Sequence, residues 1–242
     1  LRDVLREEEK NAIVHWMKYK YPNEKGITNK EKIKRRIFNQ AFQLMYLTGM
    51  RTGELIKMKW CDISDVRTGS DFEKKFNKMI NIPQENSKTG RSRNVAAPIK
   101  EHLDRIKKWY KQPPFEFDPK PDDYVFPRLT LTDIENNIPT TNVAWDKRLK
   151  QILKGSEKDG VWDSGGRRIT LYSSRHYWIT DAIMRGLPMN HIAKNCGTSI
   201  THIESTYSKV TTEMIASDIT KGLGIHSLSE ESKRKYMDKV EK

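Results

Sequence analysis

Apolar residues recur along most of the chain at the three- and four-residue spacing of amphipathic helices. The predicted helices cover residues 1–21, 31–47, 99–112, 140–154, 171–186, 188–195 and 200–209. Most of them carry a single apolar stripe. The second half of 31–47 is apolar nearly all round, which predicts that this helix lies at the centre of the core.

Three short segments have the composition of strands: residues 60–66, 79–83 and 91–98. The last two are joined by the sequence QENSKTG, a hairpin-like loop with Lys88 near its tip. Residues 67–78 are polar and are predicted to be a long connection, and the Gly- and Ser-rich residues 155–168 are predicted to be mobile. The pattern therefore predicts an α+β fold, mostly helical with a small antiparallel sheet.

The charge balance changes this picture, because the 242 residues include 45 Lys and Arg against 32 Asp and Glu, for a net charge of +13. Such a surface favours a polyanionic partner, since Lys and Arg neutralise phosphates and release counterions. A basic surface without such a partner is the simpler alternative. The two cysteines have no CxxC partner, which excludes a zinc ribbon. No apolar run approaches the roughly 18 residues that a membrane span needs.

Two stretches carry residues suited to phosphate chemistry. The sequence TGMRTGEL at 48–55 places Arg51 between two glycines that permit a tight turn close to a ligand, although a surface-loop arginine is the alternative. Glu54 either orients Arg51 or complements the dipole of the helix that begins there. Arg175 and Tyr207 lie 32 residues apart, on either side of a Gly-Thr-Ser turn at 197–199. An arginine can clamp a phosphate and a tyrosine can attack it.

The order Arg51, Lys88, Arg175 and Tyr207 resembles the catalytic domain of the tyrosine recombinase (phage integrase) family, over about residues 1–220. Residues 48–55 match the family pattern T-G-x-R-x-G-E-L, and residues 171–176 look like its second arginine box. Gly197, ten residues before Tyr207, matches the spacing of its final box. Two positions depart from the family. Tyr172 stands where the family usually has histidine, and Thr198 stands where it usually has histidine or tryptophan.

The resemblance implies a mixed α+β domain that cuts and rejoins DNA. Arg51 and Arg175 would hold the non-bridging oxygens of the scissile phosphate as negative charge grows. Tyr207 would be the nucleophile, and its covalent 3′-phosphotyrosine would conserve bond energy for rejoining. Lys88 would protonate the departing 5′-oxygen, unless it is an ordinary phosphate contact.

The roles of several nearby residues stay open. The Tyr172 hydroxyl either donates a hydrogen bond near the phosphate or belongs to a core aromatic that packs and orients Arg175. Thr198 either caps the helix that follows or bonds the phosphate. Arg91 and Arg93 are interpreted as ordinary phosphate contacts.

The resemblance also implies partners and organisation. Residues 1–220 would form the catalytic domain, and an N-terminal DNA-binding domain would lie outside this chain. The charged residues 221–242 would dock on a neighbouring subunit, or fray. The partner would be double-stranded DNA, bound by a homotetramer in the cytoplasm of a bacterial, archaeal or phage-infected cell. No cofactor is expected. No metal is expected either, because His191 and His202 are isolated.

Three other functions compete with this interpretation. A type IB topoisomerase-like enzyme would use the same chemistry to relax DNA as a monomer. A DNA-binding module that has lost catalysis would fit the two missing histidines. A basic protein that binds RNA or a membrane surface would leave the order of the four residues a coincidence.

Overall fold

The computed structural model describes residues 3–207, 212, 229–231 and 234. Its helices are α1 Glu7–Tyr19, α2 Asn29–Thr48, α3 Thr52–Ile56, α4 Asp71–Phe76, α5 Lys100–Tyr110, α6 Leu131–Glu135, α7 Asn142–Lys158, α8 Ser173–Met184 and α9 Met189–Cys196. A further helix covers 200–207. The mostly helical α+β fold predicted from the sequence is confirmed. The predicted tail at 221–242 lies almost entirely outside the described residues.

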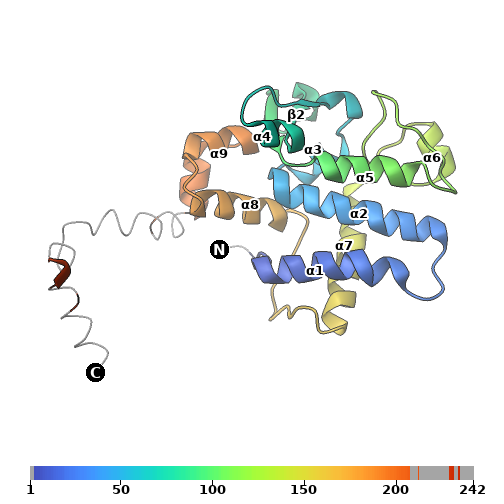
Figure 1. The fold of residues 1–242 in the computed structure, drawn as a ribbon, viewed down its shortest axis with the longest axis horizontal. Coiled ribbons are helices and arrows are strands. Elements are labelled where there is room, and N and C mark those ends of the chain that lie inside the picture. The colour runs from blue at the N-terminus through green and yellow to red at the C-terminus, as the bar shows by residue number, and fades with distance from the viewer. Residues whose placement is uncertain (1–2, 208–211, 213–228, 232–233, 235–242) are drawn as a thin grey trace.

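Helix α2 is the centre of the fold, as its apolar second half predicts. Figure 1 shows it between α1 and α5, and it also packs against α8. The helix begins where the Thr28 hydroxyl accepts a hydrogen bond from the Glu31 amide, at 3.2 Å. It ends at Gly49, which has a φ of 64°. A side chain at Gly49 would lie 2.7 Å from the Trp178 ring, so this sharp turn requires glycine.

The sheet has three antiparallel strands in the order β1 (Ile63–Asp65), β2 (Lys78–Ile82) and β3 (Arg93–Ala97). In the central strand, Ile80 lies opposite Ile63 and Val95. Both Ile80 and Val95 are fully buried, so one face of the sheet covers the core. The first strand is shorter than predicted because residues 60–62 form a 3₁₀ turn.

Three helical segments differ from the sequence prediction. Helix α4 forms inside the predicted polar connection, and α6 forms where no element was predicted; Ser70 and Thr130 cap their first turns. Helix α7 continues to Lys158, through residues predicted to be mobile. There the Ser156 hydroxyl donates to the Ile152 carbonyl at 2.7 Å, and Gly155 lets the Trp16 ring pack against the helix. The prediction that these residues are mobile, which rested on their glycine and serine content, was therefore wrong for the end of α7, because tertiary packing stabilises the helix there.

A second apolar cluster joins α8, α9 and helix 200–207. Trp178 and Ile183 come from α8, Ile192 from α9, and Ile203 and Tyr207 from the last helix. Figure 1 shows these helices together beside the end of α2. This cluster packs the helix that carries Tyr207 against α8, which carries Arg175, and α8 in turn packs against α2, which leads into the turn that carries Arg51.

Candidate active site

The turn between α2 and α3 holds Arg51 at the first position before α3. Both carboxylate oxygens of Glu54 bind this residue. Oε2 accepts from the Arg51 backbone N–H at 2.9 Å, and Oε1 accepts from its Nη1 at 3.0 Å. Glu54 therefore both caps α3 and orients the Arg51 guanidinium, so both interpretations of Glu54 from the sequence are confirmed.

Glu54 also binds Arg93 through two oxygens, which the sequence analysis did not predict. Nη1 and Nη2 of Arg93 donate to Oε1 and Oε2 at 2.9 and 2.6 Å. The exposed fractions of these two side chains are only 7% and 2%. Burial opposes ionisation of Glu54, but the hydrogen bonds and charges of Arg93 and Arg51 outweigh it and hold its pKa below the ordinary value.

Arg93 therefore connects Glu54 to the end of α9, a structural role that its interpretation as an ordinary phosphate contact did not predict. The alternation of side chains along the strand could have predicted the burial of Arg93, since Arg93 shares the face of Val95 and Ala97, which are both buried. A charge on a buried face needs a buried partner. Only the fold could show that this partner is Glu54.

Both Arg51 and Arg93 also reach the end of α9. Nη2 of Arg51 donates to the Gly197 carbonyl at 2.7 Å, and Nε of Arg93 donates to the Asn195 carbonyl at 3.0 Å. Carbonyls at a helix C-terminus carry partial negative charge and lack partners within the helix. A side chain at Gly197, which has a φ of 62°, would lie 2.7 Å from Cζ of Arg93. The Gly197 turn therefore packs directly against the two arginines, and its close approach to Arg93 requires glycine.

Arg175 lies in the first turn of α8 and is buried, with 2% of its surface exposed. Its Nη1 donates to the Gly49 carbonyl at 2.9 Å, two residues before Arg51. Burial raises the pKa of the Cys196 thiol to about 11, while the positive charges of Arg175, Arg93 and Arg51 act in the opposite direction. The charges of three guanidiniums, from three segments distant in sequence, therefore all act on Cys196. We call Arg51, Arg93 and Arg175 the arginine cluster.

A cleft of about 860 Å³ opens beside this arginine cluster. Its lining residues are Arg51, Thr89, Arg91, Ser92, Arg93, Ala193, Lys194, Gly197, Thr198, Ser199 and His202. Four of them are cations, which favours an anionic ligand. Lys88 is exposed in the turn between β2 and β3, and its neighbour Thr89 lines the cleft.

The sequence analysis gave Thr198 two alternative roles, capping the next helix or bonding the phosphate, and the structure gives the first of them to Ser199. The amide of Thr198 donates to the Ala193 carbonyl at 3.1 Å, which closes the end of α9. The Ser199 hydroxyl accepts from the His202 amide at 3.1 Å, so Ser199, not Thr198, caps helix 200–207. Thr198 itself faces the cationic cleft.

Tyr207 is buried, with 3% of its surface exposed, and its hydroxyl contacts Nδ1 of His176 in α8. The rings of His176 and Tyr172 lie edge to face, with centroids 4.9 Å apart. Tyr172 is 37% exposed, so its interpretation as a core aromatic is wrong. Two other tyrosines, Tyr46 and Tyr110, are buried in the main core.

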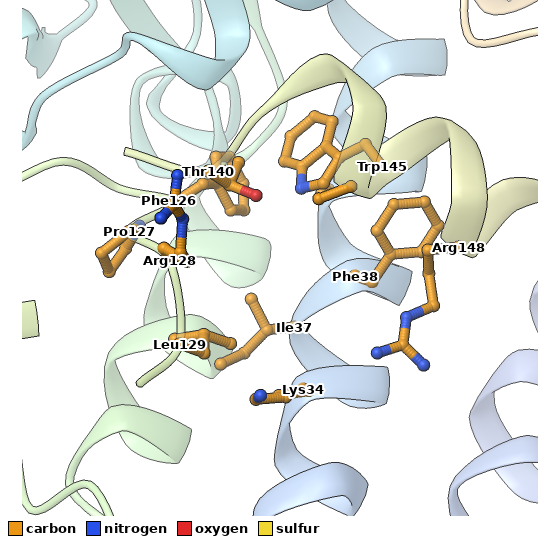
Figure 2. A pocket seen from close by; sticks show the side chains of 12 residues that line it. Lys34, Ile37, Phe38, Phe126, Pro127, Arg128, Leu129, Thr140, Trp145 and Arg148 are labelled. Carbon is orange, nitrogen blue, oxygen red and sulfur yellow. The ribbon is translucent and has the colours of Figure 1, made fainter. Parts of the chain in front are cut away.

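A second pocket, of about 170 Å³, is unrelated to the arginine cluster. Figure 2 shows the Trp145 ring near that of Phe38, with the guanidinium of Arg148 pointing away from both. Arg148 contacts Glu31 at 2.5 Å, so its charge already has a partner. This pocket is apolar core with a structural ion pair beside it.

Within the described part of the chain, no group of three or more His, Cys, Asp or Glu side chains is placed to hold a metal ion. None of the helices described is long and apolar enough to cross a membrane.

The chain is similar in sequence or in fold to several known proteins. A family model described as the phage integrase family matches residues 3–214. No curated protein sequence matches the chain. The XerH site-specific recombinase bound to a palindromic difH substrate, in a post-cleavage complex, matches 90% of the chain with 14% identity and a TM-score of 0.60.

Two integrase structures have the same fold. The Tn1549 transposon integrase in complex with transposon right-end DNA matches 90% of the chain, with 16% identity and a TM-score of 0.60. A lambda integrase dimer bound to a COC′ core site matches 87%, with 17% identity and a TM-score of 0.53. The chain covers 53% of XerH, 65% of the Tn1549 integrase and 59% of the lambda integrase.

Proposed function

Because the chain belongs to the phage integrase family, we propose that it is a site-specific DNA recombinase that cuts and rejoins DNA through a covalent 3′-phosphotyrosine. One observation carries the proposal. Arg51 lines a cationic cleft and is anchored on the Gly197 carbonyl, and Arg175 is anchored on the turn that carries Arg51, through the Gly49 carbonyl. A fixed guanidinium at such a cleft, with a second one bonded to the same turn, suits a phosphodiester more than any other common ligand.

The arginines would act on the charge that develops in the transition state. A guanidinium has five N–H donors in a planar fork and stays charged at any working pH. Glu54 and Gly197 hold Arg51, and Gly49 holds Arg175, so both forks are positioned before DNA arrives. Preorganised donors of this kind are worth roughly 10²–10³ in rate each.

Tyr207 would attack the phosphorus, and Lys88 would protonate the departing 5′-oxygen. The exposed turn that carries Lys88 allows it to approach bound DNA. The bond between Tyr207 and the 3′-phosphate would then store the energy of the broken bond, so rejoining needs no ATP. Thr198 faces the cleft and would bond the phosphate directly.

Tyr172 would keep its hydroxyl within reach of the same site, because it directly precedes α8, which carries Arg175, and is partly exposed. Comparing Tyr172→Phe with wild type in strand cleavage tests this role. Unchanged cleavage would limit Tyr172 to the contact of its ring with His176.

The partner would be double-stranded DNA, in keeping with the net charge of +13 and the cationic cleft. We propose further that four copies assemble on two DNA sites, with residues 221–242 docked on a neighbouring subunit. Residues 1–220 would be the catalytic part, with a DNA-binding domain N-terminal to it. The enzyme would act in the cytoplasm, on the nucleoid of a bacterial, archaeal or phage-infected cell.

Trapping the covalent adduct tests the proposal. A library of nicked duplexes of random sequence lets the short cleaved fragment diffuse away, so the adduct accumulates and its DNA reports the target. Wild type should form the adduct and Tyr207→Phe should not. Absence of any adduct would instead indicate a DNA-binding module. Relaxation of supercoiled DNA without exchange between paired target sites would indicate a topoisomerase-like enzyme.

A further inference from the structure

The proposed function leaves one group unassigned, the base that accepts the proton of the attacking tyrosine. The contact between Tyr207 and His176 points to this base. A phenol has a pKa near ~10, so almost all of Tyr207 carries its proton at neutral pH in the absence of other effects. When its oxygen bonds to phosphorus, that proton must leave. Arginine is a poor acceptor because it stays protonated. Lys88 must itself be protonated to act on the 5′-oxygen.

We propose that Nδ1 of His176 accepts the proton of Tyr207 as the nucleophile attacks. This inference rests on the proposed function. His176 contacts the hydroxyl of Tyr207 directly, and only 6% of the surface of His176 and 3% of that of Tyr207 are exposed. An imidazole has an ordinary pKa near ~6.5, so it is largely neutral above pH 7 and able to accept a proton.

The second apolar cluster fixes this contact. His176 lies in α8 and Tyr207 in helix 200–207, and both helices pack through Ile179, Ile183 and Ile203. The ring centroids of His176 and Tyr207 lie 5.8 Å apart. The packed core therefore sets the approach of the acceptor to the hydroxyl, as efficient proton transfer requires.

Other groups of the candidate site are weaker proton acceptors. Tyr172 and Thr198 offer only hydroxyls, which are poor proton acceptors at neutral pH. Titratable and charged groups near His176 include Tyr172 and Arg175 from α8 and Tyr207 from the last helix. The Tyr172 ring packs against the His176 ring, with centroids 4.9 Å apart, and this contact helps to hold the imidazole in place.

The step balances. The Tyr207 oxygen bonds to phosphorus, and its proton passes to Nδ1 of His176. The bond from phosphorus to the 5′-oxygen breaks, its electron pair leaves with that oxygen, and Lys88 supplies the proton. Rejoining reverses each transfer, so His176 returns the proton to the departing phenolate of Tyr207. His176 is then a base in cleavage and an acid in rejoining.

His176→Asn is the first test, because asparagine keeps a polar atom near the position of Nδ1 but is not basic. Cleavage of nicked DNA should slow by about 10²-fold or more in single turnover. The wild-type rate should fall as the pH drops through the range in which an imidazole titrates, and this limb should be absent from the variant. His176→Ala should be as slow, and added imidazole should restore part of its rate. DNA affinity and melting temperature serve as controls for folding.

A second substrate separates the base from the acid. Sulfur in place of the bridging 5′-oxygen gives a leaving group that needs no proton, because a thiol is far more acidic than an alcohol. This substrate should restore cleavage by Lys88→Ala and leave His176→Asn slow. Wild-type rates and pH profile in His176→Asn would overturn the proposal. Faster cleavage by His176→Ala would also overturn it, and would show that the contact holds Tyr207 back.

A measurement without DNA keeps this test separate from the proposed function. The ¹⁵N chemical shift of Nδ1 in His176 reports its hydrogen bond, and it should move when Tyr207→Phe removes the hydroxyl. An unchanged shift would overturn the inference, whether or not the protein cleaves DNA. A missing adduct in wild type together with a moved shift would overturn the proposed function but leave the contact established.

Discussion

Glu54→Gln tests the idea that one buried carboxylate holds the two arginines in place. The substitution keeps the shape of the side chain and removes its charge. Glu54 accepts four hydrogen bonds, from the backbone N–H and Nη1 of Arg51 and from Nη1 and Nη2 of Arg93. The glutamine Nε2 is a donor, so it would meet N–H groups where an oxygen now accepts.

The magnitude follows from burial. The Glu54 side chain is 2% exposed and that of Arg93 is 7% exposed, so solvent cannot replace the lost partner. Removing one member of a buried ion pair costs about 3–5 kcal/mol, because the other charge is left uncompensated. For a chain of this length, 1 kcal/mol lowers the melting temperature by about 2–4 °C. We therefore expect Glu54→Gln to lower it by about 6–20 °C.

Glu101→Gln is the matched control. Glu101 pairs with Arg105 one helical turn away, and these side chains are 55% and 48% exposed. Exposed pairs of this kind contribute about 0.3–0.5 kcal/mol. Urea unfolding measures both variants, and single-turnover cleavage measures whether Arg51 keeps its position. The reasoning fails if Glu54→Gln is as stable as Glu101→Gln and cleaves DNA as fast as wild type.

The stability that Glu54 contributes should also depend on pH. Its folded-state pKa is lowered, because the bonds and charges of Arg93 and Arg51 outweigh the burial that opposes its ionisation. A carboxylate of this kind stabilises the fold fully above its unfolded pKa, and this contribution is lost as the pH falls through the lower folded value. The stability difference between wild type and Glu54→Gln should therefore be constant near neutral pH and shrink below about pH 4.5.

Other predictions concern the turn, the second arginine and the thiols. Gly197→Ala should destabilise the protein more than Gly160→Ala, by about 1–3 kcal/mol in urea unfolding. Both glycines have positive φ, but a Cβ at 197 would lie 2.7 Å from a pinned guanidinium and one at 160 would meet nothing within 4 Å; equal losses would contradict this. Arg175→Lys should slow adduct formation about 10²–10³-fold in single turnover and leave DNA affinity nearly unchanged, because lysine lacks the planar pair of donors that binds two phosphate oxygens. A wild-type rate would show that Arg175 does not act in the site. Iodoacetamide should label the exposed Cys61 in the native protein and the buried Cys196 only after unfolding, as mass spectrometry of the peptides would show; native labelling of Cys196 would contradict its burial.

Periodicity was enough for the main elements, because amphipathic helices and alternating strands follow from local spacing. The apolar second half of α2 predicted its central place, and the hairpin loop placed Lys88 in an exposed turn. Periodicity failed where tertiary packing overrode composition. Helix α7 runs through Gly155 and Ser156 because Trp16 packs against the first of them.

The sequence by itself determined the family resemblance and the order of Arg51, Lys88, Arg175 and Tyr207, because motif spacing is written in the chain. It also showed that Glu54 and Arg51 lie within one turn. Local spacing is enough for such a pair, since residues three apart are neighbours on a helix.

Only the tertiary structure decided which distant side chains meet. Arg93 and Glu54 lie 39 residues apart and His176 and Tyr207 lie 31 apart, and both pairs form through packing of separate elements. No local pattern specifies such contacts, because they depend on how the sheet, the end of α9 and the second apolar cluster pack together. The two contacts that most sharpen the chemistry of this site are therefore consequences of the fold.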